Sequence, residues 1–539
     1  MVSNKRIYNW YIALVAAGCM VLTGYDASVF NALQNSHHWV AWFDEPVESP
    51  SEYTTTSSVS NRPSQGTQLI GLINSAYGIG AIVSGWFFAG PTADFLGRRL
   101  GMGIGCFVVI IATFFQCFAP RHNTGVFIVG RVLIGIGQGF ASTAGPIYIG
   151  EITPPAIRGK VMAFWQLFYS VGSFLAYWVN YAAAKHRTSL GEWDWKIVVI
   201  FQLLMPIVII AQLPFMPESP RWYIQKSNSI EQARASLSKV RDTEEDVEDE
   251  LLQIREAVEF EKEALASGKK AYLTLWQDVS VRKRLGLVFV LNMGQQLTGQ
   301  GTLNSYSSTI YKKIWASADK INLINALNAT FGILFTLNAA WTVDRFGRRF
   351  LFIVGALGMA MCMFLVAIVG LKTPNVNGTK TESVGIAIVF LLFLFIFFYK
   401  PSWGATTWIY TSEVFPMNVR AQAVGMASQM QNVSGTIFQQ FFPTFYKNCG
   451  LKSFFFFVTT DILLAVFVFF LIPETKQRSL EEMDVLFGGA NHVEQGAEMM
   501  GVKDPRHSHR QGELALTQKA QSGGKSNSSA EVEIIEARR

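Results

Sequence analysis

Apolar runs of about 20 residues recur along this 539-residue chain, and they constrain its fold more than any other feature. A helical run of that length crosses a hydrocarbon layer about 30 Å thick. Inside such a layer the backbone must satisfy its own hydrogen bonds, which leaves helices and closed barrels as possible structures. Only 16% of the residues are charged, against about a quarter in ordinary soluble domains. We therefore predict an all-α membrane protein, and the composition excludes a nucleic-acid binder and a disulfide-rich secreted scaffold.

The runs predict twelve transmembrane helices, so both ends of the chain are expected on one side of the membrane. The expected spans lie near residues 10–32, 68–90, 100–119, 125–148, 161–182, 195–214, 285–311, 321–341, 350–371, 384–408, 421–446 and 452–472. They divide the chain into an N-terminus (1–9), a six-helix bundle (10–214), a linker (215–284), a second six-helix bundle (285–472) and a tail (473–539).

Basic residues in short loops predict the orientation of the bundle, since such loops are retained in the cytoplasm. Arg98 and Arg99 follow the second expected span, Arg158 follows the fourth, and Arg348 and Arg349 follow the eighth. These loops, both termini and the linker are therefore predicted to be cytoplasmic.

The linker is expected to form short amphipathic helices, whereas the tail is expected to be disordered. Ser229 and Gln232 have the spacing of a helix cap, and Val247, Leu251 and Ile254 then recur at helical spacing between acidic residues. The tail from about residue 476 is polar and rich in Gly, Ser and Lys.

Three loop motifs occur twice, in the same order and at nearly one offset. The segment 94–99 (DFLGRR) recurs at 344–349 (DRFGRR), the segment from Glu151 to Arg158 recurs from Glu413 to Arg420, and 217–219 (PES) recurs at 473–475 (PET). The chain is thus predicted to consist of two six-helix repeats of parallel topology. In this architecture the substrate site lies between the repeats, which rock about it.

Each repeated motif places an acidic side chain beside several arginines at a helix end. Such pairs are expected to join the two halves on the cytoplasmic side and to break when that side opens. A partly exposed pair contributes about 1 kcal/mol or less, so the latch must be a network. The alternative is that these arginines only set the orientation. The expected gate residues are Asp94, Arg98, Arg99, Glu151, Arg158, Asp344, Arg348, Arg349, Glu413 and Arg420.

Taken together, the spans, the Gly-Arg-Arg loops and the segments 217–222 (PESPRW) and 473–476 (PETK) resemble the sugar porter family of the major facilitator superfamily. The resemblance covers residues from about 8 to 485, and details of the loops are similar to fungal monosaccharide transporters of the plasma membrane. It implies alternating-access transport of a sugar by a multi-pass protein that functions as a monomer, is not an enzyme and needs no cofactor.

Asp26 lies within the first expected span and Arg131 near the start of the fourth. A charged side chain at the centre of a bilayer costs about 2.5–3.5 kcal/mol on insertion scales, so Asp26 is expected to face the bundle and pair with Arg131. In the resembled family, an Asp and an Arg at these positions couple transport to protons. The alternative is a permanent brace between two helices, which would leave a facilitator.

A sugar site needs amides, which both donate and accept hydrogen bonds, and aromatic faces. The resemblance aligns four glutamines with positions that bind sugar hydroxyls and Trp408 with a residue that packs on the ring. Gly301 stands where the family usually has Asn, and Asn432 where it often has Trp. The expected substrate-binding residues are Gln166, Gln295, Gln296, Gln300, Asn304, Trp408 and Gln431.

These differences indicate a more polar site than a typical glucose site. We therefore expect a proton-coupled transporter of a monosaccharide, either a pentose such as L-arabinose or xylose, or a hexose. A facilitated-diffusion carrier and a non-transporting sugar sensor are the alternatives. Asn377 lies in a glycosylation sequon of an expected external loop, and no cysteine spacing predicts a metal site.

Overall fold

A computed structural model describes residues 4–43, 63–227, 229–266, 276, 279–315, 317–374, 380–415 and 420–475. The glycosylation sequon at Asn377 and the tail from residue 476 lie outside the described residues. The side chains of four predicted site residues also lie outside this description, although their backbones are helical: Arg158, Gln166, Asp344 and Arg420.

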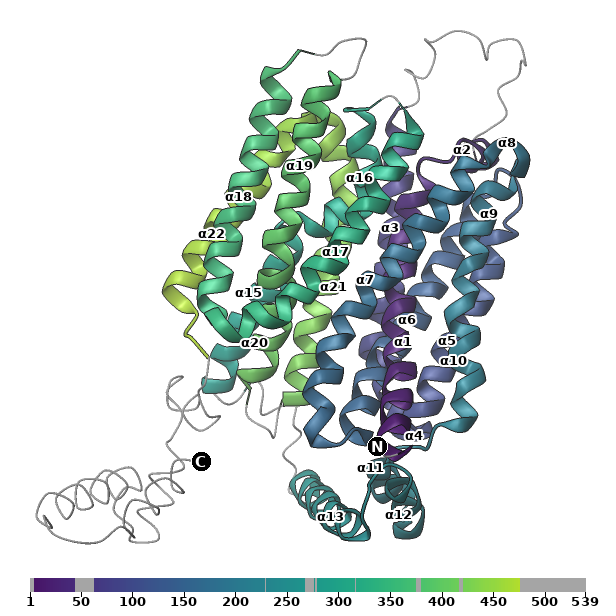
Figure 1. Ribbon diagram of the computed structural model, residues 1–539, viewed down its shortest axis with the longest axis vertical. Coiled ribbons are helices and arrows are strands. Elements are labelled where there is room, and N and C mark those ends of the chain that lie inside the picture. The colour runs from purple at the N-terminus through teal and green to yellow at the C-terminus, as the bar shows by residue number, and fades with distance from the viewer. Residues whose placement is uncertain are drawn as a thin grey trace, which may run out of the picture. The chain divides into compact units, whose positions relative to one another are not determined.

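The described residues form helices and contain no β-strand (Figure 1). The helices of the first half are α1 (Asn4–Leu33), α2 (His37–Phe43), α3 (Pro63–Val83), α4 (Gly90–Leu96), α5 (Arg98–Cys117), α6 (Thr124–Ile152), α7 (Pro155–Lys185), α8 (Arg187–Leu190), α9 (Trp193–Ile200) and α10 (Leu204–Gln212). The segment Ser84–Ala89 continues α3 as a π-helix.

Three helices lie between the halves, namely α11 (Pro220–Trp222), α12 (Ile230–Ser238) and α13 (Glu244–Ala266). The second half comprises α15 (Val279–Leu297), α16 (Gln300–Lys312), α17 (Ala318–Phe346), α18 (Arg348–Lys372), α19 (Glu382–Tyr399), α20 (Thr407–Glu413), α21 (Arg420–Cys449) and α22 (Phe454–Leu471). The π-helical segment Lys400–Thr406 joins α19 to α20.

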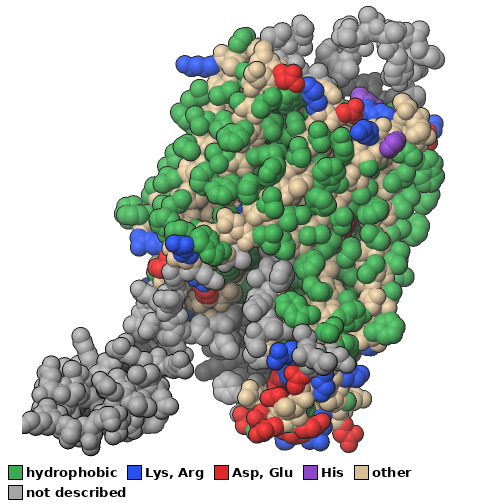
Figure 2. Space-filling view, in the orientation of Figure 1, with side chains coloured by type: hydrophobic (Ala, Val, Ile, Leu, Met, Phe, Trp, Pro, Cys, Tyr) green, Lys and Arg blue, Asp and Glu red, His purple; other side chains and the backbone are tan. Residues whose placement is uncertain are grey.

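Nine helical stretches of the described residues are long and apolar enough to cross a membrane, one of which runs from Ala423 to Leu471 across α21 and α22. Figure 2 shows apolar side chains along the sides of the bundle and charged side chains near its ends. The expected spans 161–182 and 285–311 are helical but are not among the nine. In 285–311 the physical reason is composition, because amides and hydroxyls interrupt the apolar residues of α15 and α16.

The two halves pack mainly within themselves and meet along a few helices. In the first half α1 packs on α7, and α6 packs on both α3 and α5; in the second half α18 packs on α19 and α22. The contacts between halves are those of α3 with α21, α7 with α17, and α1 with α16. Side chains from these six helices therefore border any path between the halves.

Helices α11–α13 pack at one end of the bundle, where the N-terminus also lies (Figure 1). We call this end, which carries Arg98 and Arg348, the basic end. Buried residues of α12 and α13 form an apolar cluster, namely Ala233, Leu237, Val247, Leu251 and Val258. The Ser229 hydroxyl accepts a hydrogen bond from the Gln232 amide at 3.4 Å, which is the expected cap of α12.

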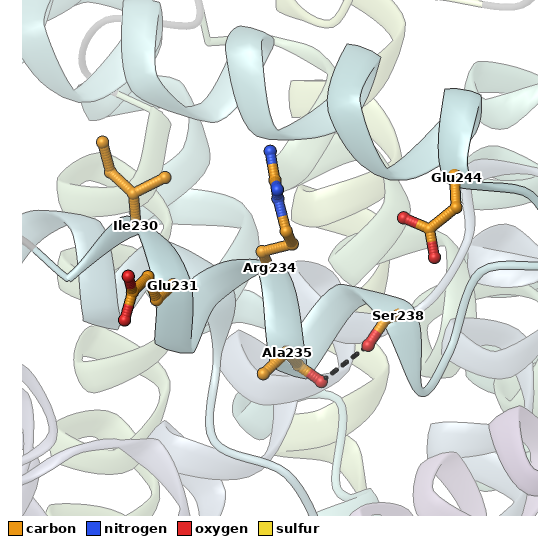
Figure 3. A pocket seen from close by; sticks show the side chains of 6 residues that line it. All are labelled: Ile230, Glu231, Arg234, Ala235, Ser238 and Glu244. Atoms are coloured by element: carbon orange, nitrogen blue, oxygen red, sulfur yellow. Dashed lines mark hydrogen bonds between the residues drawn. The ribbon is translucent and has the colours of Figure 1, made fainter.

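A hollow of about 420 Å³ lies between α12 and the start of α13 (Figure 3). Glu231, Arg234 and Glu244 line it, and Arg234 is ion-paired with Glu248. Because its walls are charged and lie outside the apolar helices, we assign it no part in substrate binding.

Candidate substrate and coupling site

Asp26, the acidic side chain expected in the first span, lies fully buried on α1. Its Oδ1 accepts a hydrogen bond from Gln202 Nε2 at 3.0 Å, and its Oδ2 has no hydrogen-bond partner among the described residues. A buried carboxylate oxygen without a donor is costly, so this oxygen is a natural place for a proton.

Arg131 is also buried, on α6 beside Asp26. Its Nη1 donates to the backbone oxygen of Asp26 at 3.1 Å, and its guanidinium lies over the rings of Tyr77 (4.9 Å) and Phe30 (5.6 Å). The expected carboxylate–guanidinium pair is therefore not formed in this arrangement. Gln202 donates a hydrogen bond to the Asp26 carboxylate instead, and two aromatic faces stabilise the Arg131 cation.

Three of the predicted glutamines present acceptor oxygens that have no partner among the described residues, namely Gln295, Gln300 and Gln431. The Nε2 of Gln295 donates to the backbone oxygen of Trp403 at 2.9 Å, which fixes this amide against the π-helical segment. An oriented amide whose oxygen lacks a donor can accept a hydrogen bond from a substrate hydroxyl.

Gln296 occupies the space that Gly301 leaves open. A Cβ atom at Gly301 would lie 2.4 Å from Gln296 Oε1, and one at Gly435 would lie 3.4 Å from its Cδ. The departure at Gly301, noted in the sequence, therefore makes room for a neighbouring amide. Asn304 donates through Nδ2 to the Tyr169 hydroxyl at 3.2 Å, which links the second half to α7.

Trp408, the expected ring-packing residue, lies on α20 and is 36% exposed. The indole of Trp403 is instead fully buried, and its Nε1 donates to the backbone oxygen of Phe352 at 3.1 Å. Trp403 therefore supports the fold of the second half, whereas the side chain of Trp408 remains partly uncovered by other protein atoms.

The sequence reasoning missed one charged residue in this region, Lys400. It begins the π-helical segment after α19, and its Nζ donates to Ser170 Oγ on α7 at 3.0 Å. The sequence does contain the indication that was needed, because Lys400 is a charged residue within the apolar run 384–408.

A second missed group closes the path between the halves at the end opposite the basic end. Asn31 Nδ2 donates to Ser307 Oγ and to the Asn304 backbone oxygen, both at 2.7 Å. One turn further, just past the end of α1, Gln34 Oε1 accepts a hydrogen bond from Thr309 Oγ1 at 2.9 Å. The backbone oxygen of Gln34 accepts from Lys312 Nζ at 2.8 Å. We call these contacts of α1 with α16 the polar seam.

At the basic end, the motif residues of the first half contact one another. Arg98 Nε lies 2.9 Å from Glu151 Oε2, and Asp94 Oδ1 lies 3.3 Å from Arg98 Nη2. Glu218 accepts from the backbone amides of Arg98 and Arg99 at the start of α5, both at 3.1 Å. Burial raises the pKa of the Glu218 carboxyl above its ordinary value, although these donors oppose the shift.

The described residues of the second half repeat the arginine–glutamate contact and the capping of the helix. Arg348 Nη2 donates to Glu413 Oε1 at 2.8 Å, and Glu474 accepts from the amides of Arg348 and Arg349 at 2.9 and 3.0 Å. Each cluster thus caps the helix after a Gly-Arg-Arg loop with the carboxylate of the PES or PET motif.

The glycines of the two loops permit this capping. Gly97 and Gly347 adopt φ angles of 101° and 86°, which side chains disfavour. A Cβ atom there would lie 2.4 Å from the carboxylate of Glu218 and 2.8 Å from that of Glu474. The observed motif pairs hold each half together, whereas the expected latch joins the halves. The latch between the halves stays a prediction.

Apolar helices long enough to cross a membrane, which bury amides and the Asp26 carboxylate among them, are typical of a membrane transporter. The sequence profile described as sugar (and other) transporter matches residues 12–487. The chain belongs to this family.

Similar proteins include transporters of two substrates. The chain is 31% identical over 506 residues to the quinate permease of Emericella nidulans, covering 90% of each, and 30% identical over 499 residues to a probable quinate permease of Aspergillus flavus, covering 90% of this chain and 89% of that protein. The inward-open structure of the xylose transporter XylE from E. coli superposes with a TM-score of 0.71 at 26% identity, covering 89% of this chain and all of XylE. A structure of the proton:xylose symporter XylE bound to 6-bromo-6-deoxy-D-glucose has a TM-score of 0.69. These relatives are transporters, and this chain is a transporter rather than an enzyme.

Proposed function

We propose that this protein carries a ring-shaped polyol across the plasma membrane by alternating access, together with a proton. Twelve spans in two six-helix repeats would form the path, and the basic end and both termini would be cytoplasmic. The observation that carries the proposal is Asp26, a fully buried carboxyl whose Oδ2 has no donor among the described residues and whose neighbour Arg131 donates to the Asp26 backbone oxygen rather than to the carboxylate. A proton on Asp26 accounts for this geometry, and loss of the proton would restore the ion pair.

The polar seam supports the alternating-access part of the proposal. It closes the end opposite the basic end through hydrogen bonds of Asn31 and Gln34. Asn31 and Gln34 are buried, but each hydrogen bond of the seam contributes a net of only about 1 kcal/mol. The seam can therefore open when the basic end closes.

The substrate we propose is a monosaccharide, either a pentose such as L-arabinose or xylose, or a hexose. Gln295, Gln300 and Gln431 would accept from its hydroxyls. Quinate, a ring polyol that also carries a carboxylate, is the second candidate, because relatives about 30% identical bear its name.

Uptake in yeast cells that lack their own hexose carriers tests this proposal. Labelled glucose, galactose, xylose, L-arabinose, a disaccharide and quinate would be supplied while the external pH is recorded. Uptake that makes the medium more alkaline and stops with a protonophore supports symport. Uptake that only equilibrates supports a facilitator, and no uptake by protein at the cell surface supports a sensor.

Replacing Gln295 with Ala is expected to raise the KM for the transported polyol about fivefold with little change in expression. The loss of one substrate hydrogen bond costs about 1 kcal/mol, and the Gln295 oxygen has no other donor to lose. Initial uptake rates over a range of substrate concentrations measure the change. A KM equal to that of the wild type would place the site elsewhere.

Replacing both Arg98 and Arg348 with Ala is expected to slow turnover at least fivefold while changing substrate affinity less than twofold. Each arginine bridges an acidic side chain of its own half, so its loss disturbs the moving ends of the bundle rather than the amides. Binding to the purified double variant and its uptake rate separate the two effects. A change in affinity alone would contradict the role of these clusters in gating.

A further inference from the structure

Lys400 is a charged side chain at the meeting of the two halves, and neither the coupling pair nor the basic-end clusters involve it. It stands at the start of a π-helical segment of the second half and reaches Ser170 on α7 of the first half. Within the described part of the chain, no carboxylate oxygen lies within 4 Å of its Nζ, and Ser170 Oγ is its hydrogen-bond partner.

The surroundings of Lys400 offer hydroxyls and no counter-charge. Ser170 Oγ lies 3.1 Å from Thr336 Oγ1, whose hydroxyl donates to the Gly332 backbone oxygen at 2.7 Å. The acidic side chains buried in the described helices are placed elsewhere. Asp26 lies against Gln202, Asp194 on α9 contacts His38, and Asp461 lies on α22, which packs on α18 and α15. An ammonium group with one neutral partner in such a place retains donors for an anion.

Lys400 begins the segment against which one amide of the candidate site is held. Gln295 Nε2 donates to the backbone oxygen of Trp403, three residues after Lys400, at 2.9 Å, and Tyr399, the residue before Lys400, lies beside Gln295. A ring polyol bound by Gln295 would therefore lie against the π-helical segment that Lys400 begins.

We propose that Lys400 binds a carboxylate carried by the substrate, so that the transported molecule is a ring polyol with one acidic group. This inference rests on the proposed transport function and narrows its substrate class. It also changes the charge that is moved. A monoanion that crosses with one proton carries no net charge, whereas a neutral sugar that crosses with one proton carries one positive charge.

Equilibrium binding to the purified full-length protein tests the inference, with quinate and its uncharged methyl ester as probes. The wild type is expected to bind quinate at least tenfold more tightly than the ester. Lys400→Gln is expected to weaken quinate binding at least tenfold and ester binding less than twofold, whereas Lys400→Arg is expected to preserve most of the preference for quinate.

Lys313→Gln is the matched control. It removes an exposed lysine at the end of α16 that stacks on Tyr446, and it should bind both probes as the wild type does.

Equal weakening of both probes by Lys400→Gln, or a wild type without preference for quinate, would overturn the inference. Thermal unfolding of each variant identifies one that has lost its fold, in which case Lys400→Arg and the wild-type preference decide the matter.

Uptake into proteoliposomes provides a second readout and separates this inference from the proposed function. An imposed membrane potential, negative inside, is expected to leave proton-driven quinate uptake unchanged, and an increase with potential would count against carboxylate binding. Proton-driven uptake of xylose alone, at the same rate in the wild type and in Lys400→Gln, would leave the proposed function standing and reject the role of Lys400. No proton-driven uptake of any ring polyol would reject the proposed function itself.

Discussion

Asp26→Asn is expected to abolish accumulation of substrate against a gradient while leaving exchange of internal for external substrate. Asn has the shape of Asp and keeps a hydrogen bond to Gln202 possible, but it can neither bind nor release a proton near neutral pH. A proton gradient equivalent to 100 mV supplies about 2.3 kcal/mol per proton, which concentrates the substrate by some tens of fold. A pH difference supplies this driving force for an anion that crosses with a proton as well as for a neutral substrate. The variant should fall from that ratio to about one. Proteoliposomes with an imposed proton gradient measure accumulation, and the same vesicles without a gradient measure exchange.

Asp461→Asn provides the matched control for this experiment. Asp461 is equally buried, on α22, and neither of its carboxylate oxygens has a hydrogen-bond partner among the described residues. Removal of its charge should leave accumulation intact, because α22 packs on α15 and α18 away from Arg131. Undiminished accumulation by Asp26→Asn would reject the coupling role of Asp26, and the same loss in both variants would show that any buried charge of this bundle is needed for folding.

The repeated loop motifs show how far sequence reasoning reaches. Their residue types predicted that acids and arginines would meet at helix ends, and the structure brings Arg98 to Glu151 and Arg348 to Glu413. Which chain segment each carboxylate meets could not be read from spacing. Glu218 and Glu474 accept hydrogen bonds from backbone amides, and a sequence pattern does not show which backbone donors are available.

The polar residues between the halves were only partly predictable. The resemblance pointed to Asn304, which contacts Tyr169 of the first half, whereas Asn31 and Gln34 were not predicted. Both lie at the end of the first apolar run, where polar residues are normal at a membrane surface. Only the packing of α1 on α16 distinguishes a residue that joins the halves from one that faces water.

Arg131 illustrates a different limit. Opposite charges inside two apolar runs predict an ion pair, but a transporter passes through more than one arrangement. Tyr77 and Phe30 offer the guanidinium an alternative to the carboxylate, and under the proposed mechanism the same sequence must also allow the ion pair. Sequence reasoning therefore identifies the partners, while their pairing depends on the state of the protein.

Gly135→Ala is expected to lower the free energy of unfolding, because α3 and α6 touch at this glycine. A Cβ atom there would lie 2.1 Å from the backbone oxygen of Tyr77 on α3, and neither helix backbone can yield locally. Overpacking of this kind costs about 1–3 kcal/mol. The displaced helix would also move Tyr77, whose ring lies under the Arg131 guanidinium, so the coupling site should be disturbed as well.

Gly150→Ala, on the same helix, is the matched control for the substitution at Gly135. A Cβ atom at Gly150 would have no heavy atom within 4 Å, and Ala is favoured over Gly in a helix by roughly 0.5–1 kcal/mol. The control should therefore unfold at the wild-type temperature or slightly above it, whereas Gly135→Ala should unfold at a lower temperature and lose proton-driven accumulation. Thermal unfolding of both purified variants makes the comparison. If Gly135→Ala is as stable as Gly150→Ala, the close approach of α3 and α6 at Tyr77 does not exist in the membrane, and the position assigned to Arg131 fails with it.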